Sequence, residues 1–185
     1  NTALRQGQYF FSDIRREGIV LYELDDEPLA EPKPLTPRHA YEAAKEHLDE
    51  RLPGAFGFLD TFGYSLRKGR QKEAAFLLHQ AIEHAYATVL LVLTHYSPPS
   101  HNLKFLRALA EDQDRRLAEV WPRQEQRHRA WFNTLNEAYV KARYSKHYAI
   151  SEEALAWLGE RTAELHRLVE QVCLAHLSRL KDRSD

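Results

Sequence analysis

Methionine is absent from the 185-residue sequence, including position 1, and only one cysteine is present. The missing initiator indicates that residue 1 is not the native start, which predicts a fragment or a processed product. The lone Cys173 excludes an intrachain disulfide and a multi-cysteine zinc site. Because Cys173 lies within an apolar helical pattern, we expect it to be a plain buried thiol.

The sequence also lacks the common signatures of enzyme sites. Its seven glycines are scattered singly, which excludes a glycine-rich phosphate loop, and it contains neither a His-Glu-x-x-His helix nor a Gly-x-Ser-x-Gly elbow. The acidic pair Asp25-Asp26 is not accompanied by the Gly-Ser and Asp-x-Asp residues that hold magnesium for nucleotidyl transfer. We therefore expect no bound metal, no cofactor and no nucleotidyltransferase activity from this chain alone.

Long apolar runs are missing as well. The most apolar stretch, Ala85–Thr94, is too short to span a bilayer, and no secretory segment opens the chain. Charged residues at 29% and hydrophobic residues at 43% are typical of a globular protein, so we expect a cytoplasmic protein with no membrane partner. The formal net charge of −1 disfavours indiscriminate nucleic-acid binding, so any contact with phosphate requires a local basic patch.

What the chain does contain falls into three parts. Residues 1–24 include the β-rich run Ile19–Leu24, which predicts a strand. Its partner is either the Gln8–Phe11 segment or a strand upstream of residue 1, because the backbone groups of a lone strand must bond to something. Residues 25–35 are rich in proline and predict a linker, and residues 36–181 carry helical patterns.

The first half of this helical region predicts two long helices. Thr36 followed by Pro37 is a strong helix start, because a capping side chain precedes a residue preset for the first turn. Pro53-Gly54 is expected to kink or split this helix, and the segment Arg67–Arg70 to end it. Lys72–His95 has a wide apolar stripe and predicts the central helix of the fold.

The second half predicts shorter helices and then a long one. Ser100 is placed to cap a helix over His101–Ala110, and the helical period resumes over Gln124–Arg143. Ser151, followed by two acidic residues, predicts the start of the last helix, Glu152–Leu180. The fold class predicted is therefore mainly α, an antiparallel bundle of about five helices with a short strand-bearing appendage at its N-terminus.

The stretch Ala138–Ile150 is the strongest candidate site. It places cations and a histidine among three tyrosines: Lys141, Arg143, Lys146 and His147, with Tyr139, Tyr144 and Tyr148. Cations bind phosphate, and aromatic rings stack on bases. If the helix continues through this stretch, Arg143 and His147 share a face and reach one phosphate. The alternative is structural: the tyrosines seal the end of the bundle while Arg143 and His147 pair with acids of the last helix.

Two further candidates lie earlier in the chain. His79 and Glu83 are one helical turn apart, which fits a metal-binding pair, a base with its orienting carboxylate, or a hydrogen-bonded pair lining a groove. His101, Lys104 and Arg107 recur at three-residue spacing beside a predicted helix start. That spacing fits either an anion-binding face or a solvated one.

Two segments together resemble a known family. Residues 76–106, FLLHQAIEHAYATVLLVLTHYSPPSHNLKFL, and residues 139–158, YVKARYSKHYAISEEALAWL, are similar to HEPN domains, in particular to the sacsin-like branch fused to minimal nucleotidyltransferases. The likeness covers about residues 36–180, and residues 7–23 resemble the tail of such a nucleotidyltransferase domain. It implies a helical bundle, a homodimer, and a groove that binds nucleotide or RNA. It also implies that the HEPN domain can be a toxin, which a nucleotidyltransferase, fused or separate, restrains.

Many HEPN members are metal-independent ribonucleases with an Arg-x4-6-His motif near the start of the last helix. This chain has Arg143-Tyr-Ser-Lys-His147, which is one residue short of the motif. The pairs Arg161–His166 and Arg123–His128 do have four intervening residues, but chance also produces such spacings.

Three hypotheses therefore remain open. The first is a module that binds nucleotide or single-stranded RNA phosphates beside a nucleotidyltransferase domain, through Lys141, Arg143, Tyr144, Lys146, His147, His101 and Lys104. The second is a metal-free ribonuclease, with Arg143 as the phosphate clamp and His147 as the acid and base. The third is a structural dimerisation module whose apolar face lies at Thr88–Tyr96.

Overall fold

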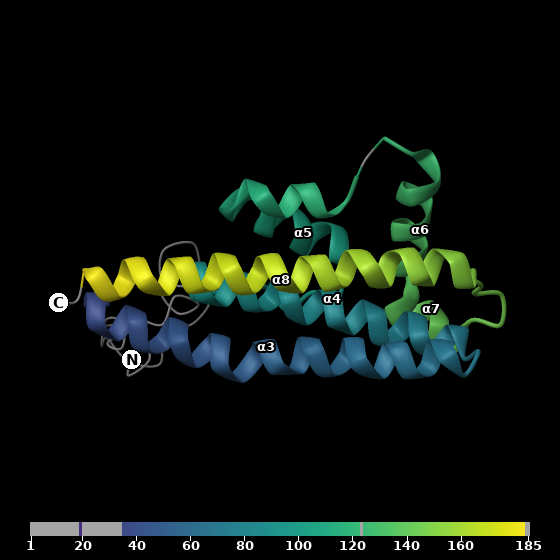
Figure 1. Cartoon of the computed structure of the whole chain (residues 1–185), viewed down its shortest axis with the longest axis horizontal. Helices are drawn as coiled ribbons and strands as arrows, with labels where there is room; N and C mark the ends of the chain where they lie inside the picture. Colours follow the sequence, from purple (N-terminus) through teal and green to yellow (C-terminus); the bar gives the residue numbers. More distant parts are fainter. Residues whose placement is uncertain (1–18, 20–34, 123, 184–185) are drawn as a thin grey trace.

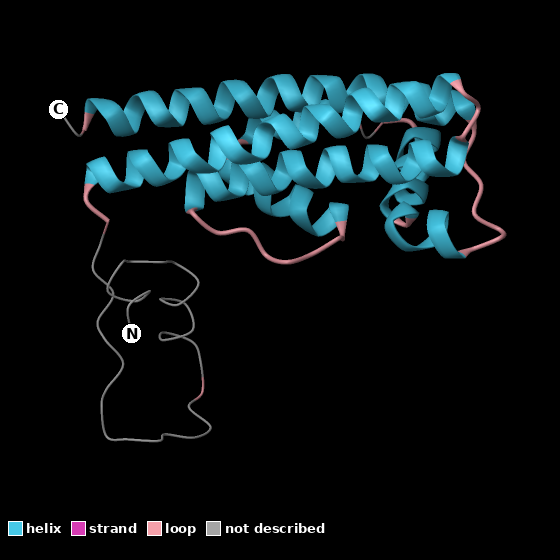
Figure 2. Cartoon of the chain, turned by 90° about the horizontal axis from the view of Figure 1, so that it is seen from below, coloured by secondary structure: helices cyan, strands magenta, loops and turns pink. Residues whose placement is uncertain are grey.

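The computed structural model describes residues 19, 35–122 and 124–183. Three long helices lie side by side along the molecule: α3 (Pro37–Arg67), α4 (Gln71–Thr94) and α8 (Glu152–Asp182) (Figure 1). Shorter helices cover one flank: α5 (Leu103–Gln113), the 3₁₀ helix η1 (Arg115–Val120), α6 (Gln126–Asn136) and α7 (Ala138–Tyr144). All the described elements are helical (Figure 2), which confirms the mainly-α bundle predicted from the sequence. The predicted strand-bearing segment and linker lie outside the described residues, apart from Ile19 and Leu35.

The ends of the long helices follow the local sequence signals. Thr36 Oγ1 accepts a hydrogen bond from the backbone N–H of His39 at 3.3 Å, and Ser151 Oγ accepts one from Ala154 at 3.1 Å. Gly69, just past the end of α3, has a φ of +68°, the left-handed conformation that glycine adopts without strain. These signals therefore fix where α3 turns back into α4 and where α8 begins.

Helix α4 is the centre of the bundle. It packs against α3 and α8 along its length and also contacts α5, α6 and α7. By length and apolar composition α4 alone would pass as a membrane span, but its side chains from Ala74 to Val92 are largely buried against these neighbours. That is the pattern of a core helix. Cys173 of α8 is buried in the same core, and burial raises the pKa of its thiol to about 12, which confirms the buried thiol.

Pro53-Gly54 is expected from the sequence to kink or split the first helix, and the split does not occur. Helix α3 runs without interruption from Pro37 to Arg67, with Pro53 exposed on its surface. A proline inside a helix costs about 3 kcal/mol. The apolar side chains on either side of it, Leu48 and Phe62 among them, are buried in the core and outweigh this cost.

Two other predicted boundaries also differ. Helix α5 begins at Leu103 and not at His101, because the cap is Asn102, whose side chain accepts from the backbone N–H of Lys104 and Phe105. The predicted helix Gln124–Arg143 is two helices, α6 and α7, separated at Glu137. Tertiary hydrogen bonds converge there: Tyr148 Oη donates to the carbonyl of Thr134, and the side chain of Asn136 accepts from Lys104 N–H.

Candidate functional site

The predicted site around Arg143 and His147 does not lie on one helix. Helix α7 ends at Tyr144, and Ser145 is extended, with φ −97° and ψ 127°. Lys72 holds the following turn by donating to the carbonyl of Ser145 at 2.8 Å. Because the helix ends before His147, Arg143 and His147 do not share a helical face. The expectation that they lie one turn apart on a continuous helix is therefore corrected.

Arg143 is exposed and held by aromatic rings. Its guanidinium carbon lies 4.4 Å from the ring centroid of Tyr139, 4.9 Å from that of Phe76 and 5.1 Å from that of Tyr144. Its Nε donates to the carbonyl of Tyr139 at 2.7 Å. Within the described part of the chain it forms no ion pair with an acid. The two terminal amino groups of the guanidinium thus remain available for an external anion.

The structure brings His101 to the same tyrosine. Its imidazole stacks on Tyr139 with ring centroids 3.5 Å apart and planes inclined by 13°. His101 Nδ1 lies 3.0 Å from the Glu83 carboxylate, which is 15% exposed, while the His101 side chain is half exposed. A carboxylate that accepts from Nδ1 leaves Nε2 as the atom that meets solvent or a ligand. We call this group the Tyr139 cluster: Phe76, His79, Glu83, His101, Tyr139 and Arg143.

His79 supports the Tyr139 cluster from inside the core. It is fully buried, and burial lowers the pKa of its imidazole to about 4, so the ring is neutral near pH 7. Its Nε2 then donates to the carbonyl of His101 at 3.0 Å, and its Nδ1 accepts from Gln80 at 3.4 Å. Nδ1 lies 3.6 Å from Glu83, but a neutral ring forms no ion pair. The Glu83 carboxylate lies closer to His101, at 3.0 Å, and orients that imidazole.

The other predicted residues divide between surface and core. Tyr148 is buried and seals the bundle near α6, as the structural alternative predicted, whereas Tyr144 is 75% exposed. Lys141 pairs with Glu137 at 2.9 Å, while Lys146 and His147 lie exposed in the turn after α7. Within residues 124–183, neither Arg143 nor His147 forms an ion pair with an acid of α8, so that half of the structural alternative is not met.

The two pairs with the longer Arg–His spacing are poor catalytic candidates. His166 is fully buried in α8, with its Nε2 3.1 Å from the carbonyl of Ala81. His128 is buried too, and stacks on Trp157 with ring centroids 4.0 Å apart. Neither imidazole is exposed at the surface, where an RNA strand would run.

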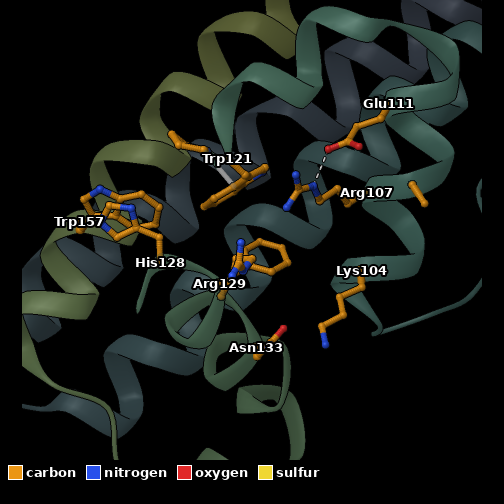
Figure 3. Close-up of a pocket in the computed structure, with 11 residues that line it drawn as sticks. Lys104, Arg107, Glu111, Trp121, His128, Arg129, Asn133 and Trp157 are labelled. Carbon is orange, nitrogen blue, oxygen red and sulfur yellow. Dashed lines mark hydrogen bonds and ion pairs between the residues drawn. The ribbon is translucent and has the colours of Figure 1, made fainter. Parts of the chain in front are cut away.

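A cavity of about 340 Å³, which the sequence did not predict, lies between α5, α6 and α8 (Figure 3). We call it the aromatic pocket, and its lining residues are Lys104, Arg107, Ala108, Glu111, Trp121, Pro122, His128, Arg129, Phe132, Asn133 and Trp157. Figure 3 shows Trp157 and His128 at one end of the pocket and Arg107 and Glu111 at the other. Lys104 and Asn133 lie along a further edge. Its size and mainly apolar walls are those of a small-molecule site.

The wall of the aromatic pocket is anchored in the core. Trp121 Nε1 donates to the hydroxyl of the fully buried Tyr86 at 2.7 Å, which fixes the segment after η1. Burial raises the pKa of the Tyr86 hydroxyl, so the phenol stays protonated at any physiological pH. The ring of Trp121 lies 4.7 Å from that of Phe132, and both side chains are almost fully buried. The wall is therefore rigid.

Charged groups stand at the edges of the aromatic pocket. Arg107 forms an ion pair with Glu111, and both side chains are 13% exposed. The Nη2 atom of Arg107 and the Nδ1 atom of His128 are buried without a hydrogen-bond partner. Lys104 and Arg129 are exposed. Of these residues, sequence reasoning singled out Lys104 and Arg107 for their spacing on α5 but not the aromatic walls, because those come from separate segments of the chain.

The described residues contain no group of three or more His, Cys, Asp or Glu side chains arranged to hold a metal ion.

The long-helix bundle, the Tyr139 cluster and the aromatic pocket define a helical module that presents arginine and aromatic chemistry at its surface. Residues 48–172 match the HEPN domain, and the chain belongs to this family. The matched span contains the whole Tyr139 cluster and the whole aromatic pocket. A HEPN domain is a module connected with nucleotides and RNA. No curated protein gives a significant match to the chain.

Proposed function

We propose that the chain binds the phosphates of nucleotides or single-stranded RNA on the surface around Arg143. The observation that carries this proposal is the state of the Arg143 guanidinium. It is exposed, braced by three aromatic rings and hydrogen-bonded through Nε alone, with no acidic partner in the described part of the chain. An arginine held in this way presents a preorganised fork of donors to a phosphate.

The surroundings of Arg143 suit a strand of RNA better than a compact anion. Tyr144 is exposed and offers a face on which a base can stack. Lys146 and His147 lie exposed in the adjoining turn, and an open hollow next to Ala142 includes Arg70 and Lys72 together with the acidic Glu73. Proteins usually bind single-stranded nucleic acid on a surface where cations alternate with aromatic rings.

The test is a titration of the purified chain with a short fluorescent single-stranded RNA. Replacing Arg143→Ala removes the fork, so we expect about a tenfold loss of affinity, the effect of one charge-assisted contact. Arg127→Ala is the matched control: Arg127 is also exposed and lies over a ring, that of Trp131, but it pairs with Glu125 and Glu153. Equal losses in both variants, or none in Arg143→Ala, would contradict the proposal.

A second candidate function is RNA cleavage without a metal, which the Glu83–His101 pair favours. In this reaction the 2′-hydroxyl attacks the adjacent phosphorus and the bond to the 5′-oxygen breaks. It needs a group that moves a proton and a cation that stabilises the charge on the phosphate. His101, oriented by Glu83, and Arg143 contact the same Tyr139 ring and fit these two roles.

The two ribonuclease hypotheses differ in their histidine. If His101 is the proton carrier, cleavage of RNA in the presence of EDTA is abolished in His101→Ala and in Arg143→Ala but persists in His147→Ala. The reverse pattern for the two histidines would restore His147 as the acid and base. Circular dichroism of each variant separates loss of catalysis from loss of fold.

The resemblance adds a setting to this proposal: a homodimer in the cytoplasm that works beside a nucleotidyltransferase domain, in the manner of a toxin and its antitoxin. In the predicted dimer face at Thr88–Tyr96, Thr88, Val89 and Val92 are fully buried within the chain itself, whereas Leu91, Leu93 and residues 94–96 are half-buried. Light scattering of the purified chain measures its mass directly. A monomer at micromolar concentration would remove the homodimer from the account.

A further inference from the structure

We propose that the aromatic pocket is a second binding site, separate from the Arg143 surface, which takes a planar aromatic base that carries a terminal phosphate. The ligand is a mononucleotide or the phosphorylated end of an RNA strand. The two sites share no residue: the pocket is built by α5, the segment after η1, α6 and α8, and the Tyr139 cluster by α4, α7 and the loop before α5. Failure of either proposal therefore leaves the other standing.

The shape and chemistry of the walls select a flat ring. Trp121, Phe132 and Trp157 line the pocket, and none of the three is free to collapse into it. Trp121 is tied to Tyr86, and Trp157 is covered by the stacked ring of His128 at 4.0 Å. A base that enters gains ring contacts on an already ordered surface, which lowers the entropic cost of binding.

The charges at the edge of the pocket select a phosphate. Lys104, Arg107 and Arg129 are positive and Glu111 is negative, which leaves a net charge of about +2. A terminal phosphate monoester carries about −1.5 to −2 near pH 7, so the charges match.

Two buried atoms beside the pocket also lack a partner. Arg107 Nη2 and His128 Nδ1 have no hydrogen-bond partner, although both side chains line the pocket. Figure 3 shows the Arg107 guanidinium extending from α5 toward Trp121. A buried polar group without a partner is destabilising. Because both atoms are covered in the empty pocket, a ligand reaches them only if these two side chains turn, and the heteroatoms of a base can then supply their partners.

Tryptophan fluorescence tests this site without labelling, because two of the three tryptophans of the chain line the pocket. We expect AMP to quench the emission in a saturable way. Adenosine, which lacks the phosphate, and ribose 5-phosphate, which lacks the base, should each bind at least about tenfold more weakly. No quenching by AMP up to about 1 mM, or equal binding of ribose 5-phosphate and AMP, would overturn the proposal.

Exposed cations provide variants that leave the wall intact. Lys104→Ala and Arg129→Ala should each weaken AMP binding by about fivefold to tenfold. Arg38→Ala, which removes an exposed cation of α3 that forms an ion pair with Glu42, should leave it unchanged. If AMP binding is instead lost in Arg143→Ala and kept in Lys104→Ala, the nucleotide binds at the Arg143 surface and the second site does not exist.

Competition between AMP and RNA distinguishes a free nucleotide from the end of an RNA strand as the ligand of the pocket. A short RNA with a 5′-phosphate displaces AMP from the pocket if the site receives RNA ends, whereas the same RNA with a 5′-hydroxyl does not. If neither RNA competes and AMP binds, the site is specific for free nucleotide. Equal displacement by both RNAs would show that no terminal phosphate is read, which contradicts the proposal.

Discussion

The imidazole of His101 lies flat on the ring of Tyr139, with centroids 3.5 Å apart and planes inclined by 13°. This contact joins the loop before α5 to α7, two segments far apart in the sequence. The guanidinium of Arg143 lies 4.4 Å from the centroid of the same ring. One tyrosine therefore positions both groups of the candidate site, and its removal should disturb both.

Replacing Tyr139→Leu should lower the stability of the fold by about 1 kcal/mol, because the stacked pair is lost while most of the apolar volume stays. The same change should weaken RNA binding roughly threefold to fivefold, since Arg143 loses one of its cation–π contacts. Tyr139→Phe keeps the ring and should match the wild type in both measurements. Urea denaturation and RNA titration check the two effects, and a Tyr139→Phe variant as weak as Tyr139→Leu would show that the hydroxyl matters instead.

Stability should fall on mild acidification. Burial holds the pKa of His79 at about 4 in the folded chain, against about 6.5 for an unfolded histidine. Between these values the unfolded state binds more protons than the folded state. The contribution of His79 to the free energy of unfolding is therefore intact above pH 6.5 and is lost as the pH falls toward 4. The total loss from His79 is at most about 3 kcal/mol.

Burial also lowers the pKa of His166, so its contribution has the same sign. Denaturation curves at pH 7.5, 6 and 5 test the assignment to His79 through the variant His79→Gln, whose amide can still donate to the His101 carbonyl. The variant should lose less stability than the wild type over this range. Parallel losses in the two proteins would contradict the account.

Two helical glycines should respond in opposite ways to alanine. A Cβ at Gly159 of α8 would lie 2.6 Å from Cε1 of Phe62 in α3, so Gly159→Ala should destabilise the bundle by about 1–3 kcal/mol. Gly57 of α3 has nothing within 4 Å of such a Cβ, so Gly57→Ala should stabilise the chain by up to about 1 kcal/mol. Thermal denaturation of the pair measures both signs. A stabilising Gly159→Ala would mean that α3 and α8 do not approach so closely.

Cys173 should be inert in the native state. It is buried, and its pKa is raised to about 12, so the reactive thiolate is scarce and inaccessible near neutral pH. A thiol reagent should label the chain only after it unfolds in denaturant. Rapid labelling of the native chain would indicate that α8 opens locally, which the packing of the core does not predict.

The outline of the fold was predictable because its signals are local. The caps at Thr36 and Ser151 and the turn at Gly69 act within a few residues, and the apolar stripe of α4 follows one period. The errors occurred where tertiary contacts override such signals. Burial of the flanking side chains carries α3 through Pro53. At the break between α6 and α7, Tyr148 donates a hydrogen bond to Thr134 and Asn136 accepts one from Lys104.

The candidate site was predictable only in part. The density of charge and tyrosine in 138–150 identified Arg143, but the partners of its neighbours depend on distant segments. The packing of the loop before α5 brings His101 onto Tyr139. The same packing places His101, and not His79, within hydrogen-bonding distance of Glu83. The aromatic pocket had no local signal at all, because Trp121, Phe132 and Trp157 are far apart in the sequence and meet only in the folded chain.

The most direct test of phosphate binding at Arg143 is the salt dependence of RNA affinity in the wild type and in Arg143→Ala. Each phosphate neutralised on a single strand contributes about −0.7 to the slope of log K against log salt concentration. If Arg143 contacts one phosphate, the slope of the variant should be shallower by about this amount, while that of Arg127→Ala should equal the wild type. Identical slopes for the wild type and Arg143→Ala would show that Arg143 contacts no phosphate.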